Sequence, residues 1–197
     1  MKRKAIAEAT IRLERARAAV SDMETAVDRS FADFETAWWR FILAAAGLYS
    51  KLEQGAKGNG KSKAWSGRVK HTRRKDPLLS YLHHARNSEY HALEGSTSKV
   101  GITATPARKG VRVINPTKEG ETAQVFVDIP SKAGALVKLH PPGIRLVEVR
   151  NERCKDTFPV PTHHLGQELV DQMPLTVAKA GLGYLEGLVA EAATLPE

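Results

Sequence analysis

The N-terminal half of the chain has the hydrophobic spacing of long amphipathic helices. From Lys4 to Asp28, apolar residues recur at alternating intervals of three and four, along one seam formed by Ile6, Ala9, Leu13, Ala16, Val20, Met23 and Val27. This spacing predicts a helix that packs on one neighbouring helix or on a second copy of the chain. Ser30 and Asp33 suit a helix N-terminus, so a second, more deeply buried helix is expected from there to about Gln54.

Glycine and lysine dominate the next segment and change the expected structure. Residues 55–67 contain four glycines among lysines, which predicts a loop because glycine disfavours helix. Asp76 and Pro77 then have the preferences of an N-cap and a first helical residue. A third helix is therefore expected from there to about Gly95, where glycine favours a stop.

After Gly95 the pattern becomes that of short strands. β-branched residues cluster at 100–105, 111–114, 123–129 and 144–150, and glycine, proline or asparagine separates the clusters. This pattern predicts four strands in a small antiparallel sheet, with a fifth near 157–160 as an option. The stretch 133–139 fits a helical turn or a further strand equally well.

A helix from Pro174 to Ala193 is expected to end the chain, with an apolar stripe formed by Leu175, Ala178, Leu182, Leu185 and Val189. It could pack under the sheet or return to the helical domain, and the second arrangement is slightly favoured. The expected fold class is α+β, an N-terminal helical bundle with a small antiparallel β-sheet region and a C-terminal helix. The expected division is a basic helical domain at 1–97, a β-rich region at 98–160 and a C-terminal segment at 161–197.

Charge is distributed unevenly along the 197 residues. Residues 1–100 hold 19 Lys and Arg against 11 Asp and Glu, whereas residues 101–197 hold 11 of each, so the first half carries the whole net charge of +8. Such asymmetry favours a polyanionic partner, nucleic acid before a membrane surface. No apolar run reaches the roughly 20 residues of a membrane span, and the N-terminus lacks the pattern of a signal peptide. Together with a single cysteine, Cys154, this leads us to expect a cytoplasmic protein without an internal disulfide.

The basic segment that follows the second helix is a candidate nucleic-acid interface. Its candidate binding residues are Lys57, Lys61, Lys63, Trp65, Arg68, Lys70, Arg73, Arg74 and Lys75. Lysine and arginine would bind phosphates, and the indole of Trp65 could stack on a base. A solvated surface loop with Trp65 folded onto the core is an equally weighted interpretation.

The third helix contains the candidate chemistry. Its sequence includes Arg86-Asn87-Ser88-Glu89-Tyr90-His91, an arginine and a polar residue followed by a histidine at the sixth position. Over roughly residues 30–95, this motif and the pattern around it resemble the HEPN superfamily, helical proteins of prokaryotic toxin–antitoxin and phage-defence systems. The resemblance implies a helical bundle that forms a homodimer and cuts RNA without a metal. It also implies a shared cleft lined by Arg86 and His91 of both subunits, and a cognate antitoxin or regulatory protein as a partner.

The residues suit this chemistry independently of the resemblance. RNA cleavage through the 2′-hydroxyl needs a base, an acid and positive charge on the phosphorane. Histidine titrates near neutral pH, so His91 could serve as base or acid, while Arg86 could hold two phosphate oxygens. Asn87 would orient the substrate or His91. On an ideal helix Asn87, His91 and His84 share one stripe, with Arg86 at its flank and Tyr90 in support.

Three functions remain open on the sequence. The first is a metal-independent RNA endonuclease of HEPN type, acting as a toxin or defence effector. The second is a non-catalytic nucleic-acid-binding or regulatory protein on the same scaffold, and the third is an oligomeric interaction protein that uses the seam of the first helix. No cofactor is expected, and no metal site, because the histidines lack the spacing of a helical zinc site. Ion pairs to Glu89 or Glu94 remain an alternative role for Arg86.

Overall fold

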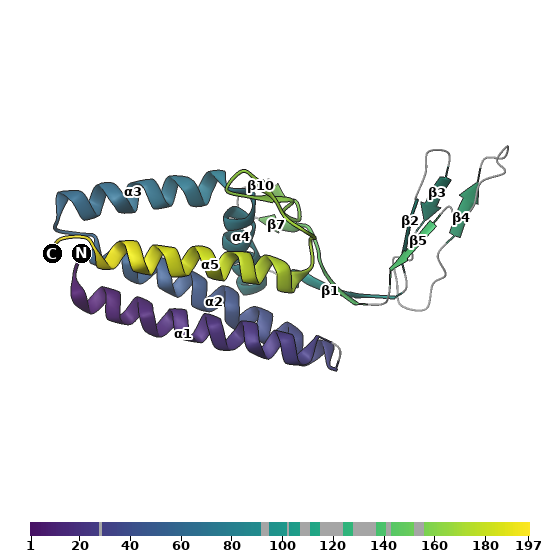
Figure 1. The fold of residues 1–197 in the computed structure, drawn as a ribbon, viewed down its shortest axis with the longest axis horizontal. Coiled ribbons are helices and arrows are strands. Elements are labelled where there is room, and N and C mark those ends of the chain that lie inside the picture. Colours follow the sequence, from purple (N-terminus) through teal and green to yellow (C-terminus); the bar gives the residue numbers. More distant parts are fainter. Residues whose placement is uncertain are drawn as a thin grey trace. The chain divides into compact units, whose positions relative to one another are not determined.

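The computed structural model describes residues 1–27, 29–91, 95–101, 103–106, 111–114, 124–127, 137–140, 143–151 and 156–197. Within these ranges, residues 89–91, 103, 105–106, 111, 127, 138–140 and 151 are described by their backbone only. The chain divides into two compact units. Unit 1 comprises residues 1–97 and 146–197, and unit 2 comprises residues 98–145. The fold is α+β, since five helices and several antiparallel strand pairs occur in the described residues (Figure 1).

Unit 1 is built on two long helices that pack along each other. α1 (Arg3–Ala26) is followed closely in the sequence by α2 (Phe31–Gly55), and the hydroxyl of Ser30 accepts a hydrogen bond from the amide of Asp33 at 3.2 Å, as the sequence predicts. The predicted seam of α1 is buried through Ala9, Leu13, Ala16, Val20 and Met23. It packs against α2 and α5 (Pro174–Ala193) of the same chain. The seam is therefore used within the monomer and is not free to join a second copy.

The predicted glycine-rich loop is wrong for most of its length, because residues Gly60–Lys75 form helix α3. The side chain of Asn59 caps this helix, accepting from the amides of Lys61 at 2.9 Å and Ser62 at 3.2 Å. Trp65 then anchors it, with only 2% of its surface exposed. A cap and one large buried side chain thus outweigh the low helix propensity of the glycines.

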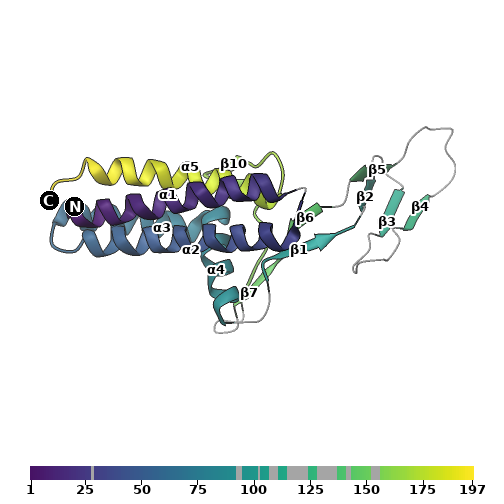
Figure 2. The same ribbon diagram turned by 90° about the horizontal axis from the view of Figure 1, so that it is seen from below.

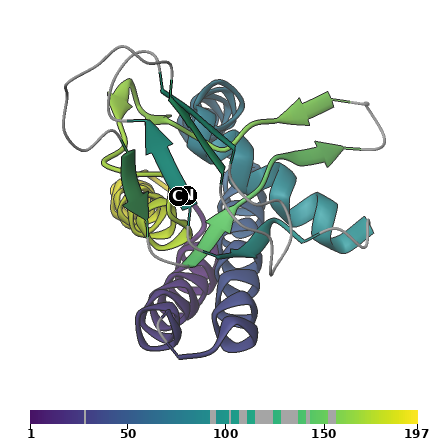
Figure 3. The same cartoon turned by 90° about the vertical axis from the view of Figure 1, so that its right-hand side faces the viewer.

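Helix α4 (Pro77–His91) follows directly and runs across the other four helices. The axes of those four helices are nearly parallel, so that Figure 3 shows them end-on. A carboxylate oxygen of Asp76 accepts from the amide of Leu79 at 2.8 Å, which confirms the predicted N-cap. The other carboxylate oxygen accepts from the amide of Leu165 at 2.6 Å. The Nδ1 atom of His164 lies 3.0 Å from the oxygen that accepts from Leu79. Asp76 therefore fixes both the start of α4 and a distant hairpin.

Two short hairpins pack on α4 and belong to unit 1. The first pairs β7 (Val149–Asn151) with β8 (Asp156–Phe158), and the second pairs β9 (His163–His164) with β10 (Gln167–Glu168). The hydroxyl of Tyr81 on α4 donates to the carbonyl of Val147 at 2.7 Å. The β-rich unit consequently ends at Arg145 rather than at residue 160, because these later strands find their partners on the helical unit.

The described residues of unit 2 form paired strands rather than one continuous sheet. β2 (Thr103–Pro106) pairs with β5 (Val137–His140), and β3 (Val111–Ile114) pairs with β4 (Gln124–Val127), both antiparallel. β1 (Thr97–Val100) pairs with β6 (Gly143–Leu146) where the chain enters and leaves this unit (Figure 2). For the stretch 133–139, where the sequence fits a helical turn or a strand, the structure has strand β5 from Val137 onward. Residues 133–136 lie outside the described part.

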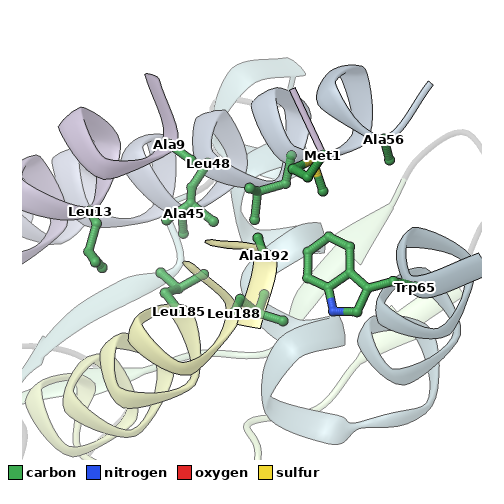
Figure 4. Close-up of a cluster of buried hydrophobic side chains, with 11 residues drawn as sticks. Met1, Ala9, Leu13, Ala45, Leu48, Ala56, Trp65, Leu185, Leu188 and Ala192 are labelled. Atoms are coloured by element: carbon green, nitrogen blue, oxygen red, sulfur yellow. The ribbon is translucent and has the colours of Figure 1, made fainter. Parts of the chain in front are cut away.

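The hydrophobic core of unit 1 draws on four helices. Leu13 of α1, Leu48 of α2, Trp65 of α3 and Leu185 of α5 meet in one buried cluster (Figure 4). The return of α5 to the bundle agrees with the favoured arrangement of the C-terminal helix. None of the helices in the described part of the chain is long and apolar enough to cross a membrane.

Candidate functional site

One face of α4 borders a cavity of about 430 Å³ between α4 and α2. The α4 residues that line it follow the spacing of one helical face, i, i+3, i+4, i+7 and i+8, and are Leu79, Leu82, His83, Arg86 and Asn87. From α2 the lining includes Leu43, Gly47, Tyr49, Ser50 and Glu53. The cavity therefore has an apolar floor and a polar edge, the usual composition of a small-ligand site.

Two guanidinium groups approach this cavity from different helices. The Nη1 atom of Arg86 donates to the side-chain oxygen of Asn87 at 3.1 Å, so that the two predicted residues form one unit. Arg73, near the end of α3, also lines the cavity, and its guanidinium carbon lies 4.7 Å from the centre of the Tyr49 ring. Among the residues whose side chains the structure describes, Glu53 is the one carboxylate in the lining. An excess of positive charge at a concave surface favours an anionic ligand.

His83 is the histidine of this cavity, and its surroundings keep it neutral. Partial burial lowers the pKa of His83 to about 4, and the positive charges of Arg73, His84, Arg86 and Arg74 act in the same direction. At neutral pH the imidazole is therefore uncharged, with a proton on one ring nitrogen and a lone pair on the other. An anion bound between the guanidiniums would oppose these charges and raise the pKa again.

Tyr49 contributes a phenol that stays protonated. Burial is the main cause of the raised pKa of Tyr49, and the nearby phenol of Tyr184 adds to it. Within the described part of the chain, the buried hydroxyl of Tyr49 has no hydrogen-bond partner. An unpartnered buried hydroxyl is costly, so this group destabilises the fold unless a partner reaches it.

His84, predicted to share a stripe with Asn87 and His91, lies on a different side of α4. Its ring stacks on Phe158 of β8, with centroids 3.5 Å apart and an angle of 8°. Burial lowers the pKa of His84, and Asp156 partly opposes this. His84 is therefore not among the residues that line the cavity, and the supporting role predicted for it stays a prediction. The side chains of Tyr90 and His91 lie outside the described residues, as does Cys154.

The predicted nucleic-acid residues separate into three groups. Trp65 is in the core, so base stacking by its indole is excluded in this fold. Arg73 lines the cavity. The remaining basic side chains are exposed on or just before α3, and are Lys57, Lys61, Lys63, Arg68, Lys70, Arg74 and Lys75. Arg68 and Lys70 each lie 3.9 Å from a carboxylate, of Glu191 and Glu53 respectively.

Sequence reasoning missed His83, Tyr49 and Glu53 as members of the site. For His83 the signal was present, because it stands three and four residues before Arg86 and Asn87. Tyr49 and Glu53 could not be assigned, since their role depends on how α2 meets α4. Among the described residues no cluster of three or more His, Cys, Asp or Glu side chains could hold a metal ion. No protein-family model matches the chain, and no similar curated protein or solved structure was found.

Proposed function

We propose that this protein is a metal-independent RNA endonuclease of HEPN type, with its active site at the cavity between α2 and α4. The observation that carries the proposal is that Arg86 and Asn87, hydrogen-bonded at 3.1 Å, line the same cavity as Arg73 and His83. The two guanidiniums could stabilise the charge that develops on the phosphorane, which is one of the requirements of phosphodiester cleavage.

In this mechanism the 2′-oxygen of the substrate attacks the adjacent phosphorus, and the bond from phosphorus to the 5′-oxygen breaks. Arg86 forks onto the phosphorane oxygens, and Asn87 holds that guanidinium in place. His91 exchanges a proton with the 2′-hydroxyl or the leaving 5′-oxygen, and a second His91, from a twin chain, serves the complementary role. The products are a 2′,3′-cyclic phosphate and a 5′-hydroxyl.

The biological setting proposed with this activity is cytoplasmic. A homodimer would bring two copies of the motif together, and a cognate antitoxin or regulatory protein would restrain the nuclease. The exposed cations of α3 would draw RNA toward the cavity, because electrostatic attraction raises the association rate of a polyanion.

The test is cleavage of an unstructured RNA oligonucleotide in EDTA, with product ends identified by mass spectrometry. Arg86→Ala and His91→Ala should each lower the rate at least 100-fold while circular dichroism stays unchanged, since each removes a group that acts in the transition state. His71→Ala is the matched control, because His71 is an exposed histidine on α3, and it should stay within about twofold. Full activity of folded Arg86→Ala would reject the proposal.

A non-catalytic nucleic-acid-binding protein is the second candidate. It is favoured by α3 itself, which has seven Lys and Arg and no acidic residue in its 16 positions. This function predicts binding that weakens steeply with salt and no turnover. It would replace the first proposal if neutralising the exposed α3 cations abolished binding while Arg86→Ala changed nothing.

A further inference from the structure

A second hollow adjoins the cavity along α2. It is a groove of about 550 Å³ between α1 and α2, and its charged lining residues are Arg12, Arg15 and Asp22 of α1 and Arg40 of α2. Leu43 and Gly47 line both the groove and the cavity. The two hollows are therefore neighbours, separated only by this part of α2.

Two of the three arginines that line the groove have no carboxylate partner among the described residues, which is also true of several exposed lysines of the bundle. Arg17 is paired with Glu186 at 2.8 Å, and Lys51 lies 3.9 Å from Glu8. In contrast, neither Arg12 nor Arg15 has a carboxylate within 4.0 Å among the described residues. Arg40 is bonded to Asp22 at 3.1 Å, which leaves the groove with two uncompensated charges. Positive charge held without a partner in a concave surface concentrates anions.

Gly47 allows Arg12 to lie where the two hollows meet. A Cβ atom at position 47 would stand 3.3 Å from Cδ and 3.4 Å from Nε of Arg12, closer than ordinary side-chain contacts. Glycine inside a helix costs about 1 kcal/mol relative to alanine. Here it gives the Arg12 side chain room to lie close against α2 at the position that borders both hollows.

We propose that this groove binds the phosphates that flank the cleaved position of a single-stranded RNA. That the strand is RNA rests on the proposed function, whereas the binding of phosphates by the groove does not depend on it. The strand occupies the cavity, passes Arg12 at Gly47 and continues along Arg15 and Arg40. Residues 40–53 of α2, which border both hollows, span about 20 Å, the length of roughly six stacked nucleotides. A single strand is required, because a cavity of about 430 Å³ admits one nucleotide but no duplex.

The test measures binding to RNA that cannot be cut. Fluorescein-labelled 2′-O-methyl oligouridines of three and eight nucleotides are titrated with protein in EDTA, and affinity is read by anisotropy at several salt concentrations. The variant is Arg12→Gln with Arg15→Gln. Its matched control is Lys2→Gln with Lys4→Gln, since both residues are exposed at the start of the same chain segment and remove the same charge.

The groove variant should bind the eight-nucleotide strand at least tenfold more weakly and the three-nucleotide strand within twofold of wild type. Its slope of log affinity against log salt should flatten by about 1.4, because two phosphate contacts are lost at about 0.7 each. The control should change both affinities less than twofold. Gly47→Ala, which disturbs only the crossing point, should weaken the longer strand several-fold without lowering the melting temperature.

Equal losses in variant and control, or equal losses for both strand lengths, would overturn the proposal. So would tight binding of an eight-residue polyaspartate peptide at the groove in place of the RNA, which would identify an acidic protein as the partner. Because these strands cannot be cleaved, the result is independent of catalysis. Groove binding with no cleavage of ordinary RNA would reject the nuclease alone, whereas cleavage with unaltered binding by the groove variant would reject the groove alone.

Discussion

Helices α3 and α4 follow each other directly and both carry cationic side chains, yet they use them differently. On α3 the lysines face solvent and the helix is anchored by Trp65. On α4 the cationic and imidazole groups of Arg86 and His83 line a cavity, where they contact an amide and alter a pKa. We therefore expect the placement of a basic residue beside a cavity, rather than the number of charges, to decide whether it acts at long range or at a specific site.

The largest expected effect is the loss of stability on removing Trp65, the buried side chain that anchors α3. Trp65→Ala should destabilise the protein by about 3–5 kcal/mol, because it removes a buried aromatic side chain from the shared core. Lys63→Ala, an exposed residue of the same helix, should change stability by less than about 0.5 kcal/mol. Urea denaturation of both variants measures this. A Trp65→Ala cost below about 1 kcal/mol would mean that α3 is not held by its core side.

A smaller effect is expected at Asp76, the junction of the two helices. Asp76→Asn keeps the size of the side chain but replaces the carboxylate whose two oxygens accept from the amides of Leu79 and Leu165. We expect it to lower the free energy of unfolding by about 2 kcal/mol. Asp171→Asn is the control, because Asp171 is exposed and accepts from the amide of Met173. Its cost should be well under 1 kcal/mol by the same denaturation measurement. Equal costs would show that burial of Asp76 adds nothing.

The comparison also shows how far the sequence determines the fold. The seam of α1, the cap at Ser30 and the start of α4 at Asp76 were predicted, because each depends on local spacing or a local hydrogen bond. Helix α3 was missed, since glycine and lysine obscured the anchoring role of Trp65. His84 stacks on Phe158, 74 positions later in the chain, and such a tertiary contact has no signal in the sequence around α4.

The pKa of His83 tests the cavity side of the comparison. We expect NMR titration to give a pKa of about 4, because partial burial and then the charge of Arg73 oppose protonation. Arg73→Gln should raise that value, and an Arg3→Gln control should leave it unchanged. The pKa of His83 is lower in the folded state than the usual 6.5 of an unfolded chain. The contribution of His83 to the free energy of unfolding is therefore fully present above about pH 6.5 and is lost as the pH falls toward 4. A titration unaffected by Arg73→Gln would separate His83 from the guanidiniums.

The smallest effect is expected from the exposed cations of α3. Lys61→Gln with Lys63→Gln should lower RNA affinity only a few-fold at low salt and not at all at high salt, because solvated charges act through a screened field. Stability and the rate of cleavage at saturating RNA should remain unchanged, since neither side chain lines the cavity. Anisotropy titrations at two salt concentrations, beside single-turnover cleavage, measure both quantities. If cleavage at saturation fell as far as in Arg86→Ala, the distinction between long-range attraction by α3 and local chemistry on α4 would be lost, because residues in solvent would then be acting on the reacting phosphate.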